Sequence, residues 1–399
     1  MKKLLLIVCL CLTVFVGTAF SETVTEMSAE ELCKAGKEAM DAEDYEKALV
    51  YFQKAADLDN AEAMDNLGNM YADGHGVEQD YEKALKYYQL AADRGIATAL
   101  YHLGRMYDYG TGVEQDYEKA LEYYPLAADL GEPRAMNNLG NMYADGHGVE
   151  PDYEKALEYY QLSADRGIPN ALYNLGRMNY FGLGLEQSYE KALEYFELAA
   201  DQNLPEAISF LGYMYEDGTG VEQSWEKALE YHQQAADLGD PYSQARLGYL
   251  YWQGIGTEQS LEKALEHFQI AADQGHSGAL NNLGYMYENG EGVEQDYEKA
   301  LEYYQLAADL GDEYAYTNLG DMYAAGHFVE QSWGKALEYY QLAADKGYPT
   351  AYFMLGDLYE NGSGVEQSYE KAREYYQSAA DLGLEEAIES LNRLEKEGH

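Results

Sequence analysis

The stretch from Ala99 to Val113 reads ALYHLGRMYDYGTGV, and variants of it return along the chain at a constant interval. Its Leu-Gly pair recurs every 36 residues without insertion or deletion. The leucines of these pairs are Leu67, Leu103, Leu139, Leu175, Leu211, Leu247, Leu283, Leu319 and Leu355. Because every unit then has the same neighbours, the chain is predicted to form one stack of repeats and not a set of independent globular domains.

Each repeat has the pattern of two helices. In the repeat around Leu103, apolar residues at helical spacing form two stripes, which are Ala99, Leu103, Met106 and Tyr107, then Tyr117, Ala120, Leu121, Tyr124 and Ala127. Gly110 lies where a left-handed turn ends the first helix, and Asp116 lies where an N-cap begins the second. In one repeat Asn203 replaces the glycine that ends the second helix, and asparagine is the next-best residue for a left-handed backbone.

The glycine after each conserved leucine falls inside the first helix. Glycine there costs about 1 kcal/mol relative to alanine. Nine copies are retained, so we expect the missing side chain to permit close approach of another helix and not to contact a ligand.

The motif quoted above, followed by Lys119, Ala120, Ala127 and Ala128, resembles the Sel-one-like repeat family, a branch of the tetratricopeptide-like solenoids. The resemblance covers nearly all of the chain after its first segment. It implies an all-α, right-handed α/α solenoid, or superhelix, of about ten helix-turn-helix repeats.

The ends of the predicted array differ from its middle. Gly36 to Tyr45 is 9 residues, whereas the matching interval from Gly68 to Tyr81 is 13. Residues 22–60 are therefore predicted to be a tetratricopeptide-like capping hairpin, followed by the repeat array at 61–382. Residues 383–399, in which Asn392 replaces the repeated glycine, are predicted to be a C-terminal capping helix with a polar outer face.

The first segment, residues 1–21, has the pattern of a secretory signal peptide. Lys2 and Lys3 precede an apolar run from Leu4 to Val16, which small residues follow. Cleavage after Ala19 and cleavage after Ser21 both fit. We expect an exported protein, either periplasmic or secreted, without stable membrane insertion once the signal is removed.

Cysteine usage is sparse for an exported chain. Cys9 and Cys11 lie in the signal, so Cys33 remains alone and no intrachain disulfide forms. Stability is then expected to come from packing. An intermolecular disulfide through Cys33 remains open.

The chain carries a formal net charge of −46, and removal of Lys2 and Lys3 makes it −46 − 2 = −48. This balance excludes a nucleic-acid binder that depends on phosphate contacts. It favours a basic protein or peptide partner. We expect a monomer without a cofactor.

Catalytic and metal-binding patterns find little support. His75, His147 and His327 share one loop position, but each repeat adds about 10 Å to a helix stack, so they do not converge on a metal. No nucleophile elbow or Walker loop is present. Cysteine-rich exported members of the family were linked to β-lactam binding or hydrolysis, but this chain lacks their cysteine pairs. We expect no enzymatic activity.

A variable column remains two residues after each conserved leucine. In the family the first helix of each repeat lines the concave face, and the resemblance implies the same here. The column reads Asn69, Arg105, Asn141, Arg177, Tyr213, Tyr249, Tyr285, Asp321 and Asp357. Arg105 and Arg177 suit a partner carboxylate. Tyr213, Tyr249 and Tyr285, with Trp252 nearby, have the side chains of interface anchors. These six residues are the predicted partner-binding site; the alternative that the tyrosines pack between first helices stays open.

Three repeats depart from the pattern at single positions. Asn179 replaces a tyrosine, Phe328 a loop glycine and Leu261 an aromatic residue, which we interpret as local variations of packing. The function predicted is a non-enzymatic protein- or peptide-binding scaffold. The alternatives are a secreted effector or adhesin that acts on another cell, and a cell-wall or β-lactam-directed hydrolase.

Overall fold

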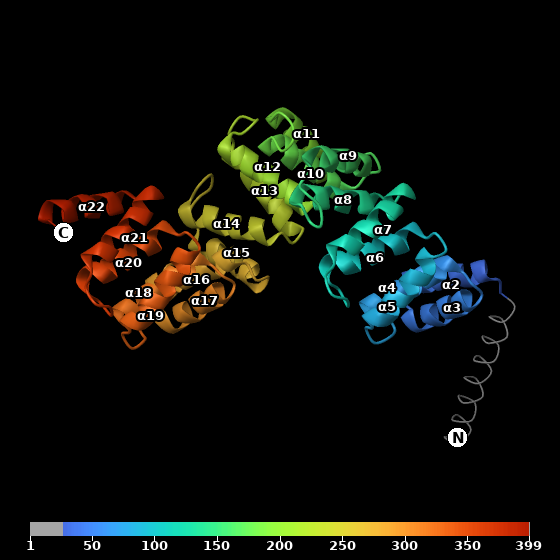
Figure 1. The fold of residues 1–399 in the computed structure, drawn as a ribbon, viewed down its shortest axis with the longest axis horizontal. Coiled ribbons are helices and arrows are strands. Elements are labelled where there is room, and N and C mark those ends of the chain that lie inside the picture. Colours follow the sequence, from blue (N-terminus) through green and yellow to red (C-terminus); the bar gives the residue numbers. More distant parts are fainter. Residues whose placement is uncertain (1–26, 399) are drawn as a thin grey trace, which may run out of the picture. The chain divides into compact units, whose positions relative to one another are not determined.

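A computed structural model describes residues 27–398, and within that range it contains 21 helices and no strand (Figure 1). The predicted signal peptide lies outside the described residues. The first helices of the hairpins are α2 (Ala29–Asp41), α4 (Ala61–Asp73), α6 (Ala97–Tyr109), α8 (Pro133–Asp145), α10 (Pro169–Phe181), α12 (Pro205–Asp217), α14 (Pro241–Gln253), α16 (Ser277–Asn289), α18 (Glu313–Ala325) and α20 (Pro349–Asn361).

The second helices follow with the same period. They are α3 (Tyr45–Asp57), α5 (Tyr81–Ala92), α7 (Tyr117–Asp129), α9 (Tyr153–Ala164), α11 (Tyr189–Ala200), α13 (Trp225–Asp237), α15 (Leu261–Asp273), α17 (Tyr297–Asp309), α19 (Trp333–Asp345) and α21 (Tyr369–Asp381), and α22 (Glu385–Glu397) ends the chain. The connection inside the first hairpin, residues 42–44, is four residues shorter than the connection at 74–80. The all-α solenoid predicted from the repeat is confirmed.

The chain divides between Leu198 and Ala199 into two units, and each is described by itself. In both units a first helix packs on its own second helix and on the second helix of the preceding repeat. First helices of neighbouring repeats also touch, as α6 touches α8 in one unit and α14 touches α16 in the other. Neighbouring second helices, within the described range, are in less close contact. This closer approach is the one expected of helices that line the inner side of a curved stack, and the side on which the first helices lie is called the inner surface below.

The helix ends follow the predicted chemistry. Asp116 caps α7 by accepting a hydrogen bond from the Lys119 amide at 3.0 Å. Gly110 ends α6 with a φ of 69°. Asn203 has a φ of 58° and Phe328 a φ of 61°, so both adopt the left-handed conformation of the glycines that they replace.

The glycine after each conserved leucine faces an aromatic ring of the second helix. A Cβ atom added at Gly104 would lie 2.5 Å from Cδ1 of Tyr124, and one added at Gly176 would lie 2.6 Å from Cε1 of Phe196. The same contact joins Gly36 to Phe52, Gly68 to Tyr88, Gly140 to Tyr160, Gly212 to His232, Gly248 to Phe268, Gly284 to Tyr304, Gly320 to Tyr340 and Gly356 to Tyr376. The expected close approach is confirmed, and its partner is this ring.

Second helices are linked on the outer side by a hydrogen-bond ladder. Tyr303 donates to Gln269 at 2.9 Å, and Gln269 donates to Asp273 at 2.8 Å. The same tyrosine-glutamine bond recurs in other repeats, for example from Tyr339 and Tyr375. Pro125 interrupts this ladder because it occupies the glutamine position inside α7. It also removes one backbone hydrogen bond from the helix.

The thiol of Cys33 is 2% exposed. Burial raises its pKa to about 11, and the nearby Glu62 carboxylate raises it further while Lys37 opposes. The intermolecular disulfide left open above therefore finds no support, because the thiol is inaccessible and protonated at neutral pH. No helix within residues 27–398 is both long enough and apolar enough to span a bilayer.

Gly320→Ala is expected to lower the free energy of unfolding by about 1–3 kcal/mol, because the new methyl group overlaps the Tyr340 ring. Gly334 in the same repeat has no atom within 4 Å of an added Cβ. Gly334→Ala is therefore the matched control and should be neutral or stabilising by up to about 1 kcal/mol, since it only improves helix propensity. Urea denaturation of both variants checks this. Equal effects of the two substitutions would contradict the close contact.

Pro125→Gln is expected to stabilise the first unit by about 3 kcal/mol, because it restores the helix hydrogen bond and supplies the missing ladder residue. The measurement is the urea midpoint of the purified chain. A midpoint at or below that of the wild type would show that α7 has adapted to its proline.

Candidate functional site

Where the ring packed on the glycine is tyrosine or histidine, it places a polar atom in the core that needs a hydrogen-bond partner. Four tyrosines donate to the residue two positions after the conserved leucine: Tyr88 to Asn69 at 2.8 Å, Tyr160 to Asn141 at 2.9 Å, Tyr340 to Asp321 at 2.6 Å and Tyr376 to Asp357 at 2.6 Å. A buried hydroxyl without an acceptor costs about 1–3 kcal/mol. These four members of the variable column are therefore structural acceptors and not free surface residues.

In the other five repeats the residue two positions after the leucine is not the acceptor for the buried ring. Tyr124 donates to Asp108 at 3.0 Å, Tyr304 donates to Glu288 at 2.7 Å, and His232 Nε2 lies 3.1 Å from Glu216. These acids stand five residues after the conserved leucine. The two remaining rings are Phe196 and Phe268, which need no acceptor.

In these five repeats the residue two positions after the leucine does not accept a hydrogen bond from the buried ring, and we call it released. The released residues are Arg105, Arg177, Tyr213, Tyr249 and Tyr285, which are five of the six predicted site residues. The sequence analysis did not recognise that the acceptor for the buried ring can stand either two or five residues after the leucine. The signal was present, because Asp108, Glu216 and Glu288 appear where the variable column holds arginine or tyrosine.

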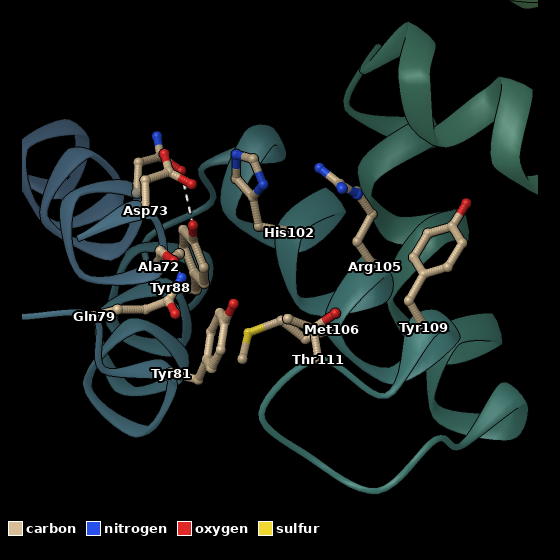
Figure 2. A pocket seen from close by; sticks show the side chains of 11 residues that line it. Ala72, Asp73, Gln79, Tyr81, Tyr88, His102, Arg105, Met106, Tyr109 and Thr111 are labelled. Atoms are coloured by element: carbon tan, nitrogen blue, oxygen red, sulfur yellow. Dashed lines mark hydrogen bonds between the residues drawn. The ribbon is translucent and has the colours of Figure 1, made fainter. Parts of the chain in front are cut away.

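Arg105 lies at the edge of a pocket of about 330 Å³ in the first unit. Figure 2 shows Asp73 and Tyr88 on one wall and His102, Arg105 and Tyr109 on the other. The guanidinium lies 5.8 and 5.9 Å from the ring centroids of Tyr101 and Tyr109. Its side chain is exposed and forms no ion pair with any residue that the structure describes.

An equivalent pocket of about 220 Å³ recurs two repeats later around Arg177. Asn141, Tyr160 and Arg177 occupy the places of Asn69, Tyr88 and Arg105. Both pockets open because the position five residues after the leucine is a small residue, Ala72 or Ala144. Arg177 is likewise exposed and has, among the described residues, ring contact with Tyr173 but no ion pair.

The aromatic members of the predicted site gather in the second unit. Trp252 lies between Tyr249 and Tyr285, with ring centroids 6.4 and 5.5 Å away. Arg246 lies over the rings of Tyr213 and Tyr249, at 5.9 and 5.2 Å from their centroids. The row draws on three successive first helices, α12, α14 and α16.

Exposure differs along this row. Tyr249 and Tyr285 are 36% and 40% exposed, whereas Trp252 is half-buried and its indole donates to Glu291 at 2.6 Å. Trp252 also packs edge-on against the core ring of Phe268, and Tyr213 packs edge-on against the core ring of His232, with centroids 4.9 Å apart.

Comparison with protein families identifies the repeat. The Sel1 repeat model matches ten consecutive ranges, which are 31–60, 61–96, 97–132, 133–168, 169–204, 205–240, 241–276, 277–312, 313–348 and 349–384. The chain belongs to the Sel1 repeat family. Among proteins of curated function, none shows significant similarity to this Sel1 repeat chain.

Two solved Sel1-type structures resemble it over long stretches. One is c5321, a protective antigen present in uropathogenic Escherichia coli strains that displays an SLR fold. It is 31% identical with a TM-score of 0.63, and the match covers 96% of this chain and 82% of the other. The second is a Sel1 repeat protein from Oxalobacter formigenes, also 31% identical, with a TM-score of 0.58. That match covers 61% of this chain and 99% of the other.

One arrangement inside the Sel1 array has the residue types of a hydrolase triad. His232 Nδ1 lies 3.4 Å from the Ser243 hydroxyl, and its Nε2 faces Glu216. The three side chains are at most 2% exposed, and Ser243 donates to Ser209 instead of to the imidazole. Although burial opposes it, hydrogen bonds from His232 and Arg246 lower the pKa of Glu216. A substrate has no access to this network, so it gives no support to the hydrolase alternative.

The loop histidines serve packing between Sel1 repeats. His75 stacks on Tyr45 and His147 on Tyr117, each with ring centroids 4.6 Å apart. No group of three or more potential metal-ligating side chains occurs in the part of the chain that the structure describes.

His102 makes the first pocket sensitive to acid. Burial lowers its pKa from 6.5 to about 4, and the nearby charges of Arg134 and Arg105 act in the same direction. The neutral imidazole stacks on Tyr88 with ring centroids 4.8 Å apart. Between pH 6.5 and 4 the unfolded chain binds the proton first, so stability present above pH 6.5 is lost as the pH falls through this window.

His102→Asn introduces the residue found at the same place in five other repeats, including Asn138 and Asn174. Relative to this variant, the wild type should lose about 3 kcal/mol of stability between pH 6.5 and 4. Urea denaturation of both proteins across that range measures the difference. A difference that does not change with pH would contradict the buried neutral imidazole.

Proposed function

We propose that this Sel1 repeat protein is a non-enzymatic scaffold that is exported to the periplasm or secreted and binds a protein or peptide partner along its first helices. The observation that carries the proposal is the pair of exposed arginines, Arg105 and Arg177, which have no ion pair in the described structure although the chain carries a net charge of −46. In so acidic a protein, an arginine left without a carboxylate on the inner surface is available to a partner.

The geometry supports a partner that presents two separate carboxylates. Two repeats add about 20 Å to the stack, and an extended segment covers that distance in about six residues. A guanidinium binds a carboxylate bidentately. Asp73 and Asp145 line the same two pockets and disfavour a polyanion. The partner is therefore a basic or neutral segment with isolated acidic side chains, as the overall charge also requires.

The aromatic row of Tyr213, Tyr249, Trp252 and Tyr285 is the second contact surface of the proposal. Tyrosine and tryptophan provide large contact areas at little loss of conformational freedom. A secreted effector or adhesin is the second candidate function. The similarity to a protein described as a protective antigen of uropathogenic Escherichia coli favours it.

The test uses a fluorescein-labelled peptide, Glu-Lys-Gly-Ser-Gly-Lys-Glu with blocked ends, and fluorescence anisotropy with the full chain. Arg105→Gln and Arg177→Gln are each expected to weaken binding about tenfold or more, because each removes a charge-assisted hydrogen-bonded pair. Arg166→Gln is the control, since Arg166 is exposed outside both pockets and bonds its own helix. Equal affinity of all three variants would contradict a carboxylate site on the inner surface.

A further inference from the structure

A stacked pair of rings recurs on the outer side of the repeats. The tyrosine four residues after the conserved leucine lies nearly parallel to a ring of the second helix, with centroids 5.5–5.9 Å apart. The pairs are Tyr71–Tyr87, Tyr107–Tyr123, Tyr143–Tyr159, Tyr215–Tyr231, Tyr251–His267, Tyr287–Tyr303, Tyr323–Tyr339 and Tyr359–Tyr375. A lysine of the second helix lies over each first-helix tyrosine, 4.4–5.0 Å from its centroid.

One repeat lacks the first ring of this pair. Asn179 stands in the tyrosine position and turns back to donate to the Leu175 carbonyl at 2.8 Å. Tyr195 therefore has no parallel ring, and Lys191 lies over no ring, in the described structure. Eight other repeats fill this place with their own side chain, so the vacancy is specific to one repeat.

Asn179, Lys191 and Tyr195 line a cavity of about 590 Å³, here called the vacant-ring site. Its apolar walls are Leu157, Leu162 and Leu185, and Tyr195 lies beside them. Leu185 replaces the valine found in most repeats, which adds one methylene group and does not substitute for a phenol ring. The sequence analysis interpreted Asn179 as a local variation of packing, but the structure leaves the space open.

The rim of the vacant-ring site is acidic. Glu154, Glu158 and Glu194 line it, and Lys191 is its one lysine. An aromatic ring placed there would stack on Tyr195 and lie under the Lys191 ammonium, as the chain's own tyrosine does in eight other repeats. Positive charges next to that ring would face the three glutamates.

We propose that the vacant-ring site binds an aromatic side chain, tyrosine above all, that a basic segment of a partner protein inserts. The ring takes the place that Tyr143 holds in the preceding repeat, and flanking lysines or arginines pair with the glutamates. The site shares no lining residue with either arginine pocket. It is therefore independent of the function proposed above.

The probe is the blocked tripeptide Lys-(3-fluorotyrosine)-Lys, observed by its fluorine resonance with the full chain. Asn179→Tyr is expected to weaken binding at least tenfold and to raise the melting temperature, because the chain then fills the site itself. Leu185→Phe narrows the cavity from its other wall and is expected to cause a similar loss. Arg105→Gln should leave binding unchanged, which separates this site from the inner surface.

Two further comparisons sharpen the test. Tyr143→Asn removes the corresponding ring one repeat earlier and is expected to create a second binding site for the same probe. The Glu-flanked tripeptide should bind at least tenfold more weakly than the Lys-flanked one at low salt, with a smaller difference at high salt. The proposal is overturned if both Asn179→Tyr and Leu185→Phe bind the probe as the wild type does, or if the Glu-flanked peptide binds equally well.

Discussion

The contact between a helical glycine and an aromatic ring of the next helix underlies the rest of the structure. It brings the two helices of each hairpin together so closely that any side chain at the glycine would overlap the ring. The loss of helix propensity, about 1 kcal/mol per glycine, is offset by burial of a large ring, which contributes about 1.5–3 kcal/mol. With Cys33 as the one cysteine in the described residues, repetition of this contact takes the place of disulfides.

The same contact determines which surface positions are available for binding. A tyrosine on the glycine needs a hydrogen-bond acceptor, and the repeats supply it from one of two positions on the first helix. Where Asn or Asp stands two residues after the leucine, that residue is committed to the core. Tyr376 uses both positions, since its hydroxyl lies 2.6 Å from Asp357 and 2.7 Å from Glu360. Where the acid five residues after the leucine is the one carboxylate acceptor, or where the ring is phenylalanine, the earlier position is released. Arg105, Arg177 and Tyr249 are released in this way, so the core hydrogen bonds separate the residues committed to the core from those that we propose to contact a partner.

The pockets of this chain lie where single residues depart from the repeat pattern. A position filled in eight repeats by tyrosine is left open at Asn179. Alanine at residues 72 and 144 opens the two arginine pockets. In each case a smaller side chain leaves space that the regular repeats fill. In both proposals, recognition depends on such omissions as well as on added residues.

Much of this was predictable from the sequence, because a strict period gives every residue type a fixed environment. The helix pairs, the cap at Asp116 and the left-handed Asn203 follow from local chemistry alone. The low helix propensity of glycine implied that another group packs closely against it. It did not identify that group, since the pairing of Gly104 with Tyr124 depends on the geometry of the hairpin. Asn69 and Asp321 were grouped with the surface column because their bonds to Tyr88 and Tyr340 depend on side-chain direction. The space at Asn179 was not predictable, because the sequence does not show that the replaced tyrosine stacks on a second-helix ring.

The central claim is that either of two first-helix positions satisfies the buried hydroxyl and thereby releases the other. A double-mutant cycle on Arg105→Asn and Asp108→Ala tests it directly through the free energy of unfolding. Asp108→Ala alone should be destabilising by about 1–3 kcal/mol, since Tyr124 loses its acceptor. Adding Arg105→Asn should recover most of that loss, because it recreates the Asn69–Tyr88 arrangement. If the double variant is as unstable as Asp108→Ala alone, the two positions are not interchangeable and the account of the released site residues is wrong.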